Sequence, residues 1–209
     1  MDNHGGPVLT RRPQRAAGFT LLEMVVTMGI FSILTALAVP TMRTWICNVK
    51  VRAVCDALQN GLRLTQSESL RRSRQVAFEL TNNTTAPFTA VANGSYWAIN
   101  AIPSMTDGTE TFAFVESGVL AAVGSNVTVT GPAAVCFNSA GRLVSNTSTN
   151  VTTATGGASC TLPGTPPVWA YDVTVTGADH PLRVQVSLGG QVHMCDPSKT
   201  FSNSNPDGC

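Results

Sequence analysis

The feature that most constrains this chain is an apolar run near its N-terminus. Between Phe19 and Pro40 the sequence reads FTLLEMVVTMGIFSILTALAVP, and Glu23 is the one charged residue in it. A helix rises about 1.5 Å per residue, so a run of this length can cross a bilayer core of about 30 Å. No second apolar stretch of the 209-residue sequence approaches this length. The sequence therefore predicts one membrane-spanning segment at residues 19–40.

The segment before the run sets the predicted orientation. Residues 1–18 are polar and carry Arg11, Arg12 and Arg15 against a single acid, Asp2. Because the cytoplasmic flanks of membrane segments are rich in basic residues, this end is expected in the cytoplasm and the rest of the chain outside it. A formal net charge of +1 with 12% charged residues argues against both a polybasic binder and a disordered chain.

Two kinds of processing are compatible with this N-terminus. The arginines, the apolar run and the small residues Ala36 and Ala38 are typical of a secretory signal with an A-x-A cleavage site, which would leave a soluble periplasmic protein. The other interpretation rests on the segment Gly18-Phe19-Thr20-Leu21-Leu22-Glu23. A carboxylate inside an apolar span costs a few kcal/mol, and a signal that is discarded gains nothing from it. Glu23 therefore favours the second interpretation.

On these residues the N-terminus resembles the type IV pilin and pseudopilin superfamily. Members carry a short basic leader that ends in Gly, then Phe, then a Glu five places into the mature chain. In that family a membrane aspartyl peptidase cuts after the Gly and methylates the new N-terminus. The resemblance implies prepilin peptidase cleavage between Gly18 and Phe19, with N-methylation of Phe19. It also implies that Glu23 sets filament register by neutralising the α-amino group of Phe19 on a neighbour.

The helix is expected to continue through residues 41–75. Apolar side chains recur there at helical spacing along one face, whereas most basic residues lie off that face. The members of the face are Cys47, Val51, Val54, Cys55, Leu58 and Leu62. Pro40 removes a backbone hydrogen bond, so a helix kink is predicted at Pro40, where pilins commonly have a proline.

From residue 76 to residue 209 the composition shifts to Thr, Val, Gly, Asn and Ser, and short strand-like runs alternate with turns. The clearest is Leu182–Leu188, whose alternation predicts a strand with one buried face. Segments 82–95 and 145–167 are expected to be long loops. The other predicted strands are Val76–Thr81, Tyr96–Ala101, Thr111–Glu116, Val127–Thr130, Ala133–Asn138 and Val168–Thr176. The predicted class is α+β: a long N-terminal helix packed on an antiparallel, β-rich C-terminal domain that is pilin-like.

Three shorter stretches resemble the minor pilins and pseudopilins called GspH, FimT or FimU. They are ALQNGLRLTQSESLRRSRQVAFEL at 57–80, the strand and turn Val135–Arg142, and Gly190–Pro197, where a C-terminal strand runs into Cys-Asp-Pro. The resemblance implies a subunit that primes or joins a type IV pilus or a type II secretion pseudopilus. Implied partners are the prepilin peptidase, other minor and major pilins, and the inner-membrane assembly platform. The precursor would be a single-pass inner-membrane protein with its C-terminal domain in the periplasm.

Four of the six cysteines are candidates for disulfides, which suit an exported domain. Cys195 and Cys209 bracket a tail that has no helix or strand pattern, and a bridge would hold this tail down. Cys136 and Cys160 then remain for a second bridge, although four cysteines alone allow three connectivities.

The other two cysteines lie on the predicted helix. Cys47 and Cys55 are eight residues apart, which corresponds to about 12 Å along the axis, too far for a disulfide. We expect both to be buried free thiols.

The sequence contains no recognisable catalytic or metal-binding motif. His193 and Cys195 are two residues apart and His180 lies nearby, but a second pair of ligands is missing. Carboxylates are sparse, and none forms a pair in a catalytic context. The chain is therefore expected not to be an enzyme, with no metal and no cofactor.

DNA binding is the alternative class of function. Some FimT-type minor pilins bind DNA through a G-R-x-R motif near the C-terminal strand, but the aligned positions Gly190–His193 read G-Q-V-H. Phosphate binding needs several basic residues acting together. Arg71, Arg72 and Arg74 form a basic cluster, but they lie at the end of the predicted helix, where cations suit the helix dipole. We expect DNA not to be a partner.

Overall fold

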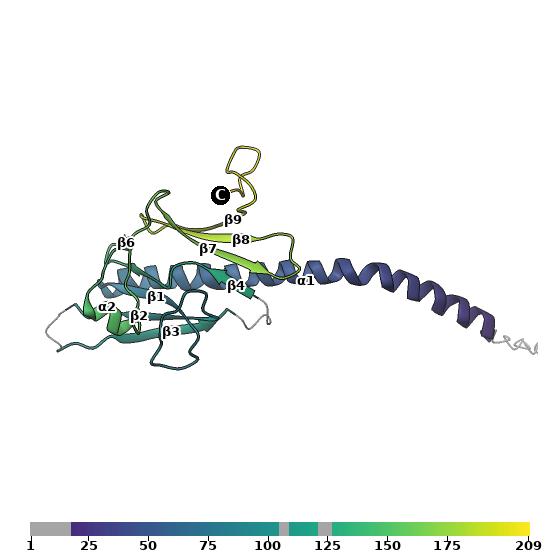
Figure 1. Ribbon diagram of the computed structural model, residues 1–209, viewed down its shortest axis with the longest axis horizontal. Coiled ribbons are helices and arrows are strands. Elements are labelled where there is room, and N and C mark those ends of the chain that lie inside the picture. Colours follow the sequence, from purple (N-terminus) through teal and green to yellow (C-terminus); the bar gives the residue numbers. More distant parts are fainter. Residues whose placement is uncertain (1–17, 105–108, 121–126) are drawn as a thin grey trace, which may run out of the picture. The chain divides into compact units, whose positions relative to one another are not determined.

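The computed structural model describes residues 18–104, 109–120 and 127–209 (Figure 1). The leader at 1–17, with its three arginines, lies outside the described residues. The helix α1 spans Leu21–Arg72. The other elements are β1 (Val76–Thr81), β2 (Tyr96–Ala101), β3 (Ala113–Val119), β4 (Val127–Thr130), β5 (Ala134–Phe137), β6 (Leu143–Val144), α2 (Thr149–Ala154), β7 (Val168–Val175), β8 (Leu182–Ser187) and β9 (Val192–Cys195).

The chain divides into two compact units, Met1–Thr41 and Met42–Cys209, and α1 contributes residues to both. In the first unit, every described side chain is exposed, from Gly18 to Thr41. A helix that is apolar on all sides is stable only when something surrounds it. By length and composition, α1 is the one helix among the described residues that could cross a membrane.

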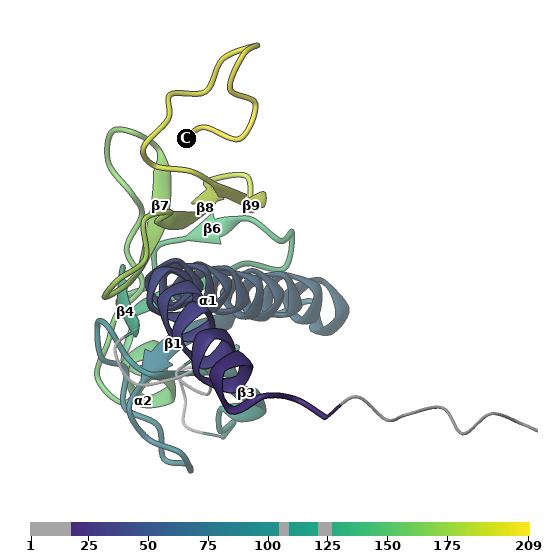
Figure 2. The same ribbon diagram turned by 90° about the vertical axis from the view of Figure 1, so that its right-hand side faces the viewer.

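The second unit contains two antiparallel sheets with the strand orders β3-β2-β1-β5-β6 and β4-β7-β8-β9. In Figure 1 and Figure 2, the part of α1 that belongs to this unit runs between strands β7–β9 and strands β1–β3. Its buried side chains share one apolar core with both sheets. This core includes Val51, Val54, Leu58 and Leu62 of α1, Phe78 and Leu80 of β1, and Tyr171, Val184 and Val186 of β7 and β8.

This arrangement confirms the predicted α+β class, a helix packed on antiparallel sheets. The predicted apolar face of the helix is buried from Val51 onward, because these side chains enter the core.

The expectation that both helix cysteines are buried is wrong in part: Cys55 is a buried free thiol, but Cys47 is only half-buried. The Cys47 Sγ lies 3.6 Å from the carbonyl oxygen of Thr176, at the edge of the core. Burial raises the pKa of Cys55 to about 12.

α1 ends with a backbone turn that glycine usually makes. Ser73 has φ 50°, and the amide of Arg74 donates to the carbonyl of Ser69 at 3.2 Å. This hydrogen bond, from an N–H to the carbonyl five residues earlier, is typical of a Schellman C-cap. It closes the last turn of the helix and satisfies a carbonyl that would otherwise lack a partner. The chain then enters β1 directly.

The strands β1, β2 and β4 have the predicted bounds, but β3 is displaced from the predicted Thr111–Glu116 toward the C-terminus. Gly118 pairs with Trp97 of β2, and an added Cβ at Gly118 would lie 2.5 Å from the Trp97 ring. The strand can extend through Gly118 because glycine leaves room for the ring of Trp97 on the neighbouring strand. Local sequence does not reveal this role.

The segment 145–167 is not simply a loop, as the sequence suggested. It contains the short helix α2, whose Val151 and Ala154 are buried in a second, smaller core. Ala77 of β1 and both Cys136 and Cys160 belong to the same core. Burial of α2 against the second face of the sheet explains a helix that its Thr- and Asn-rich sequence does not favour.

Candidate functional site

The predicted cleavage site lies immediately before α1. Gly18, Phe19 and Thr20 are outside the helix, and Phe19 is 77% exposed. An added Cβ at Gly18 would meet no atom within 4 Å. The Gly18–Phe19 bond is therefore in non-helical, accessible chain. By contrast, the alternative cleavage site around Ala36 and Ala38 is inside α1.

Thr20 and Glu23 together form the first turn of the helix. The backbone N–H of Glu23 donates to the Thr20 hydroxyl oxygen at 3.2 Å, and the N–H of Met24 donates to the Thr20 carbonyl at 3.2 Å. A Thr followed by Glu three residues later has the spacing of a capping box. The sequence analysis identified Glu23 but missed Thr20, although the T-x-x-E spacing was visible.

The position of Glu23 explains how an acid is tolerated at the start of an apolar helix. It is the acidic residue of the first turn of α1, where backbone N–H groups point outward. A negative charge there gains about 0.3–1 kcal/mol from the helix dipole at an exposed site. The helix end offsets part of the cost of the carboxylate and leaves its oxygens accessible to a cation from outside.

Pro40 lies within α1. The predicted kink at Pro40 stays a prediction.

The two disulfides join the pairs that the sequence analysis favoured among the three connectivities open to four cysteines. Cys136 of β5 is bonded to Cys160 with a Cα–Cα distance of 5.6 Å, and Cys195 at the end of β9 to Cys209 with 5.2 Å. The first bridge ties the segment after α2 to the central sheet. The second closes the C-terminal loop.

An ion pair inside this loop supports the second bridge. The Lys199 ammonium lies 2.6 Å from the Asp207 carboxylate, and the N–H of Cys209 donates to the Lys199 carbonyl at 3.0 Å. The tail is therefore ordered by covalent, ionic and backbone contacts together.

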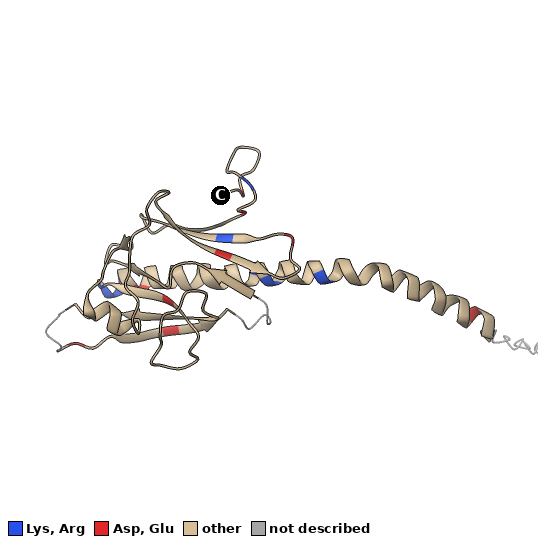
Figure 3. Ribbon diagram, in the orientation of Figure 1, with Lys and Arg blue, Asp and Glu red and all other residues tan. Residues whose placement is uncertain are grey.

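The basic cluster at the end of α1 is paired with acids. Arg71 and Arg72 both contact the carboxylate of Glu68, at 2.6 and 2.7 Å, and Arg74 contacts Glu110 at 2.8 Å. The hydrogen bonds from Arg71 and then Arg72 lower the pKa of Glu68 to about 2. Figure 3 shows acidic residues interspersed with the basic ones over the second unit. Two carboxylates therefore offset much of the charge that would attract phosphates.

The four positions aligned with the G-R-x-R motif, Gly190–His193, form the turn between β8 and β9 and the start of β9, and the backbone geometry of this turn explains the glycine. Gly190 has φ 87°, and an added Cβ would lie 1.9 Å from the carbonyl oxygen of Gly141. Only glycine fits this turn between β8 and β9. Gln191 and His193 are exposed, and the Arg63 guanidinium donates to the Val192 carbonyl at 3.2 Å. The contact from Arg63 ties the start of β9 to α1.

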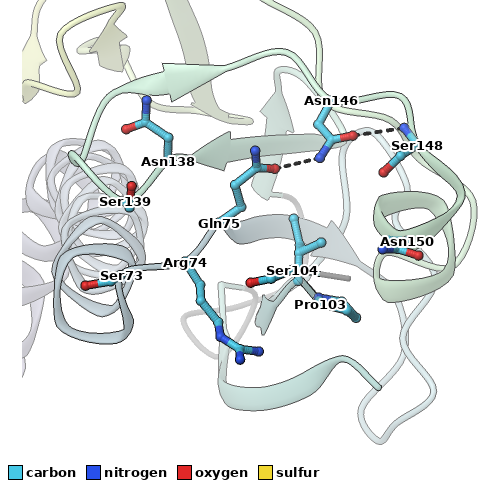
Figure 4. Close-up of a pocket in the computed structure, with 11 residues that line it drawn as sticks. Ser73, Arg74, Gln75, Pro103, Ser104, Asn138, Ser139, Asn146, Ser148 and Asn150 are labelled. Atoms are coloured by element: carbon cyan, nitrogen blue, oxygen red, sulfur yellow. Dashed lines mark hydrogen bonds between the residues drawn. The ribbon is translucent and has the colours of Figure 1, made fainter. Parts of the chain in front are cut away.

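A polar hollow of about 440 Å³ lies beside the end of α1 (Figure 4). Its lining consists mainly of amide and hydroxyl side chains. The Asn146 amide donates to Gln75 Oε1 at 2.6 Å, and Asn146 Oδ1 accepts from the Ser148 N–H at 2.9 Å. Such a lining can hydrogen-bond a neutral polar group, but it places no nucleophile beside a base. Across the ranges that the structure describes, no group of three or more His, Cys, Asp or Glu side chains could hold a metal ion.

The first unit matches a known family model. Residues 13–39 match the family described as "Prokaryotic N-terminal methylation motif". The match contains Gly18, Phe19 and Glu23. The chain thus has a prokaryotic N-terminal methylation motif that overlaps the start of the apolar helix α1, and this combination indicates an inner-membrane anchor with a C-terminal domain. No curated protein matches the chain.

Solved structures of minor pilins are similar to the chain at low identity. Two crystal forms of the type IV minor pilin FimU from Pseudomonas aeruginosa have 14% identity and TM-scores of 0.45 and 0.47. They cover 71% and 73% of this chain, and 94% and 92% of FimU. The minor pseudopilin EpsH from the Type 2 Secretion System of Vibrio cholerae has 8% identity and a TM-score of 0.45, covering 72% of this chain and 99% of EpsH.

Proposed function

We propose that this chain is a minor pilin or pseudopilin, a structural subunit of a type IV pilus or of a type II secretion pseudopilus. The observation that carries the proposal is the match of residues 13–39 to the methylation-motif family, a stretch that contains Gly18, Phe19 and Glu23. The exposed apolar helix that follows supports it, because such a helix needs either lipid or other helices around it.

In this proposal the apolar segment 19–40 anchors the precursor in the inner membrane, and prepilin peptidase removes the leader 1–18 by cutting after Gly18. The accessible, non-helical chain at Gly18 and Phe19 supports cleavage at this bond. Cleavage creates a new α-amino group on Phe19, which is then N-methylated.

The work of the mature subunit is assembly, without a chemical step. When subunits leave the membrane, the apolar surfaces of their helices pack against one another instead of lipid. The carboxylate of Glu23 then approaches the α-amino group of Phe19 on a neighbour. In low dielectric this attraction is strong, and a subunit out of register would leave both charges buried and unpaired. Glu23 therefore selects one axial register.

The partners follow from this sequence of steps. They are the prepilin peptidase, other minor and major pilins or pseudopilins, and the assembly platform of the inner membrane. The β domain, residues 76–209, would present its surface to neighbours on the periplasmic side. The Cys195–Cys209 and Cys136–Cys160 bridges suit that oxidising compartment.

The test is the N-terminal residue and mass of the mature protein, purified from membranes of a host with prepilin peptidase. The expected product begins with N-methylated Phe19. A Gly18→Val variant should remain uncut, because the peptidase of this family requires glycine immediately before the bond that it cuts. Gly29→Val is the matched control, since neither glycine has an atom within 4 Å of an added Cβ. A mature chain that begins at Val39 in the soluble fraction would overturn the proposal.

A further inference from the structure

The outer side of α1 just after Pro40 carries a row of exposed apolar side chains. Met42, Trp45, Ile46 and Val49 are 62%, 64%, 40% and 48% exposed. Their spacing of three, four and seven residues places them on one face of the helix. Trp45 and Val49 also line an open hollow of about 770 Å³ beside β8 and β9. The row belongs to the second unit, but its side chains are exposed and are not part of the core that this unit buries.

Basic residues border this row on both sides. At about 100° per residue, Arg43 and Lys50 lie along one edge of the row and Arg52 along the other. In the described part of the second unit, none of the three forms an ion pair with an acidic side chain. This contrasts with Arg71, Arg72 and Arg74, which all have carboxylate partners. An apolar stripe between cations is the pattern of a helix surface that contacts a lipid interface.

Counting along the chain places the row at the edge of the membrane. The twenty residues from Leu21 to Pro40 span about 30 Å as a helix, which equals the hydrocarbon core. The headgroup layer adds about 5–8 Å on each side. Trp45 lies five residues beyond Pro40, or about 8 Å further along the helix axis. Trp is enriched at this depth because its ring is apolar and its N–H is polar.

We propose that this surface binds lipid headgroups of the membrane that anchors the precursor. We call it the membrane collar, and its residues are Met42, Arg43, Trp45, Ile46, Val49, Lys50 and Arg52. The inference rests on the membrane anchoring in the proposed function. The apolar row lies at the boundary between headgroups and acyl chains, and the cations contact lipid phosphates.

Charge argues for lipid over a second copy of the same surface. Two collars face to face would bring Arg43, Lys50 and Arg52 of each copy together, and like charges at such distances repel. Lipid phosphates have the opposite charge and can approach from both edges of the row. The collar would then set the depth of its part of the helix in the bilayer.

The test uses the full chain reconstituted in phosphatidylcholine vesicles that contain brominated phosphatidylcholine. Bromine quenches tryptophan fluorescence on contact, so the quenched fraction reports which rings touch lipid. We expect quenching in the wild type that is strongest when the bromines are near the headgroup. It should be lost in Trp45→Phe and retained in the matched control Trp169→Phe. Because Trp45 is exposed, its replacement does not disturb the core.

A second arm tests the cations. When phosphatidylglycerol is added, quenching of Trp45 should increase in the wild type and in Arg142→Gln, an exposed control. It should not increase in the triple variant Arg43→Gln/Lys50→Gln/Arg52→Gln.

The outcomes separate this inference from the proposed function. If the chain resists carbonate extraction but its tryptophans are not quenched, the collar is wrong and the membrane anchor stands. A blue shift of Trp45 that depends on protein concentration, without quenching, would assign the surface to another copy and overturn the inference. If the chain is extracted by carbonate, both proposals fail.

Discussion

The two units of this chain differ in how they treat apolar side chains: the first leaves them exposed, and the second buries them. In the first, Leu21 is 83% exposed and Phe31 72%, and every described side chain from Gly18 to Thr41 is exposed. In the second, Leu58 and Leu62 of the same helix are fully buried between two sheets. One helix therefore serves two environments: its first part depends on partners outside the chain, and its later part depends on the chain's own strands. Substitutions in the two parts should affect different measurements.

The largest expected effect is on assembly. In Glu23→Gln, the first unit loses the carboxylate that we propose pairs with a neighbour's α-amino group, so incorporation into filaments should be lost. The thermal unfolding of the second unit should not change, because Glu23 lies outside its core. Filament yield by electron microscopy and calorimetry of the purified chain measure the two effects. Glu116→Gln, an exposed glutamate on β3, is the matched control. Normal filaments from Glu23→Gln would contradict the assigned role.

The reverse effect is expected from the buried part of the helix. Leu58→Ala removes a fully buried side chain and should lower the free energy of unfolding by about 2–5 kcal/mol. Cleavage after Gly18 should continue, since the site lies in the other unit. Chemical denaturation and N-terminal sequencing check both statements. Leu70→Ala, at an exposed position of the same helix, should change stability by no more than about 0.5 kcal/mol. Equal losses in the two variants would contradict the assigned burial of Leu58 in the core of the second unit.

The second unit should also have its own dependence on pH, through Glu79. This carboxyl group is fully buried in β1, and the Asn100 amide donates to its Oε1 at 2.8 Å. Burial raises the pKa of Glu79 from 4.5 to about 8. The folded state therefore keeps a proton that the unfolded chain releases. The stabilisation is fully present below pH 4.5 and is lost as the pH rises toward 8.

Glu79→Gln tests this dependence, because glutamine resembles the protonated acid. The wild type should lose on the order of a few kcal/mol between pH 5 and pH 8, whereas the variant should lose much less. Denaturation at several pH values measures it, and Glu116→Gln should behave like the wild type. A stability that is flat with pH in the wild type would show that Glu79 is ionised in the fold.

The smallest effect is expected at the end of α1. The ion pair between Glu68 and the exposed Arg71 contributes little to stability, so Glu68→Gln should lower the free energy of unfolding only slightly, as measured by chemical denaturation.

The wild type should not bind duplex DNA at physiological salt, because Arg71, Arg72 and Arg74 are paired with carboxylates. Titration of labelled DNA against the wild type and Glu68→Gln checks this expectation. Low micromolar affinity of the wild type with a steep salt dependence would instead favour the DNA-uptake alternative.

Local sequence pattern accounts for much of what the structure contains. The apolar run, the glycine and glutamate of the motif, the buried helical face and the strands β1, β2 and β4 all depend on neighbours in the chain. Helical and strand periodicities are local properties, so they can be recognised without knowing the fold. The pairing of Cys195 with Cys209 was also accessible, because the two residues bracket a short tail.

Other features depend on contacts between distant segments, and only the tertiary structure decided them. In the alternating pattern of β1, Glu79 looks like a solvent-facing residue, but α2 covers that face of the sheet as well. Helix α2 itself exists because Val151 and Ala154 enter the second core. Arg74 meets Glu110 across 36 residues. Likewise, the helical period predicts that Trp45 and Cys47 lie on different faces, but only the packed sheets determine which face remains exposed.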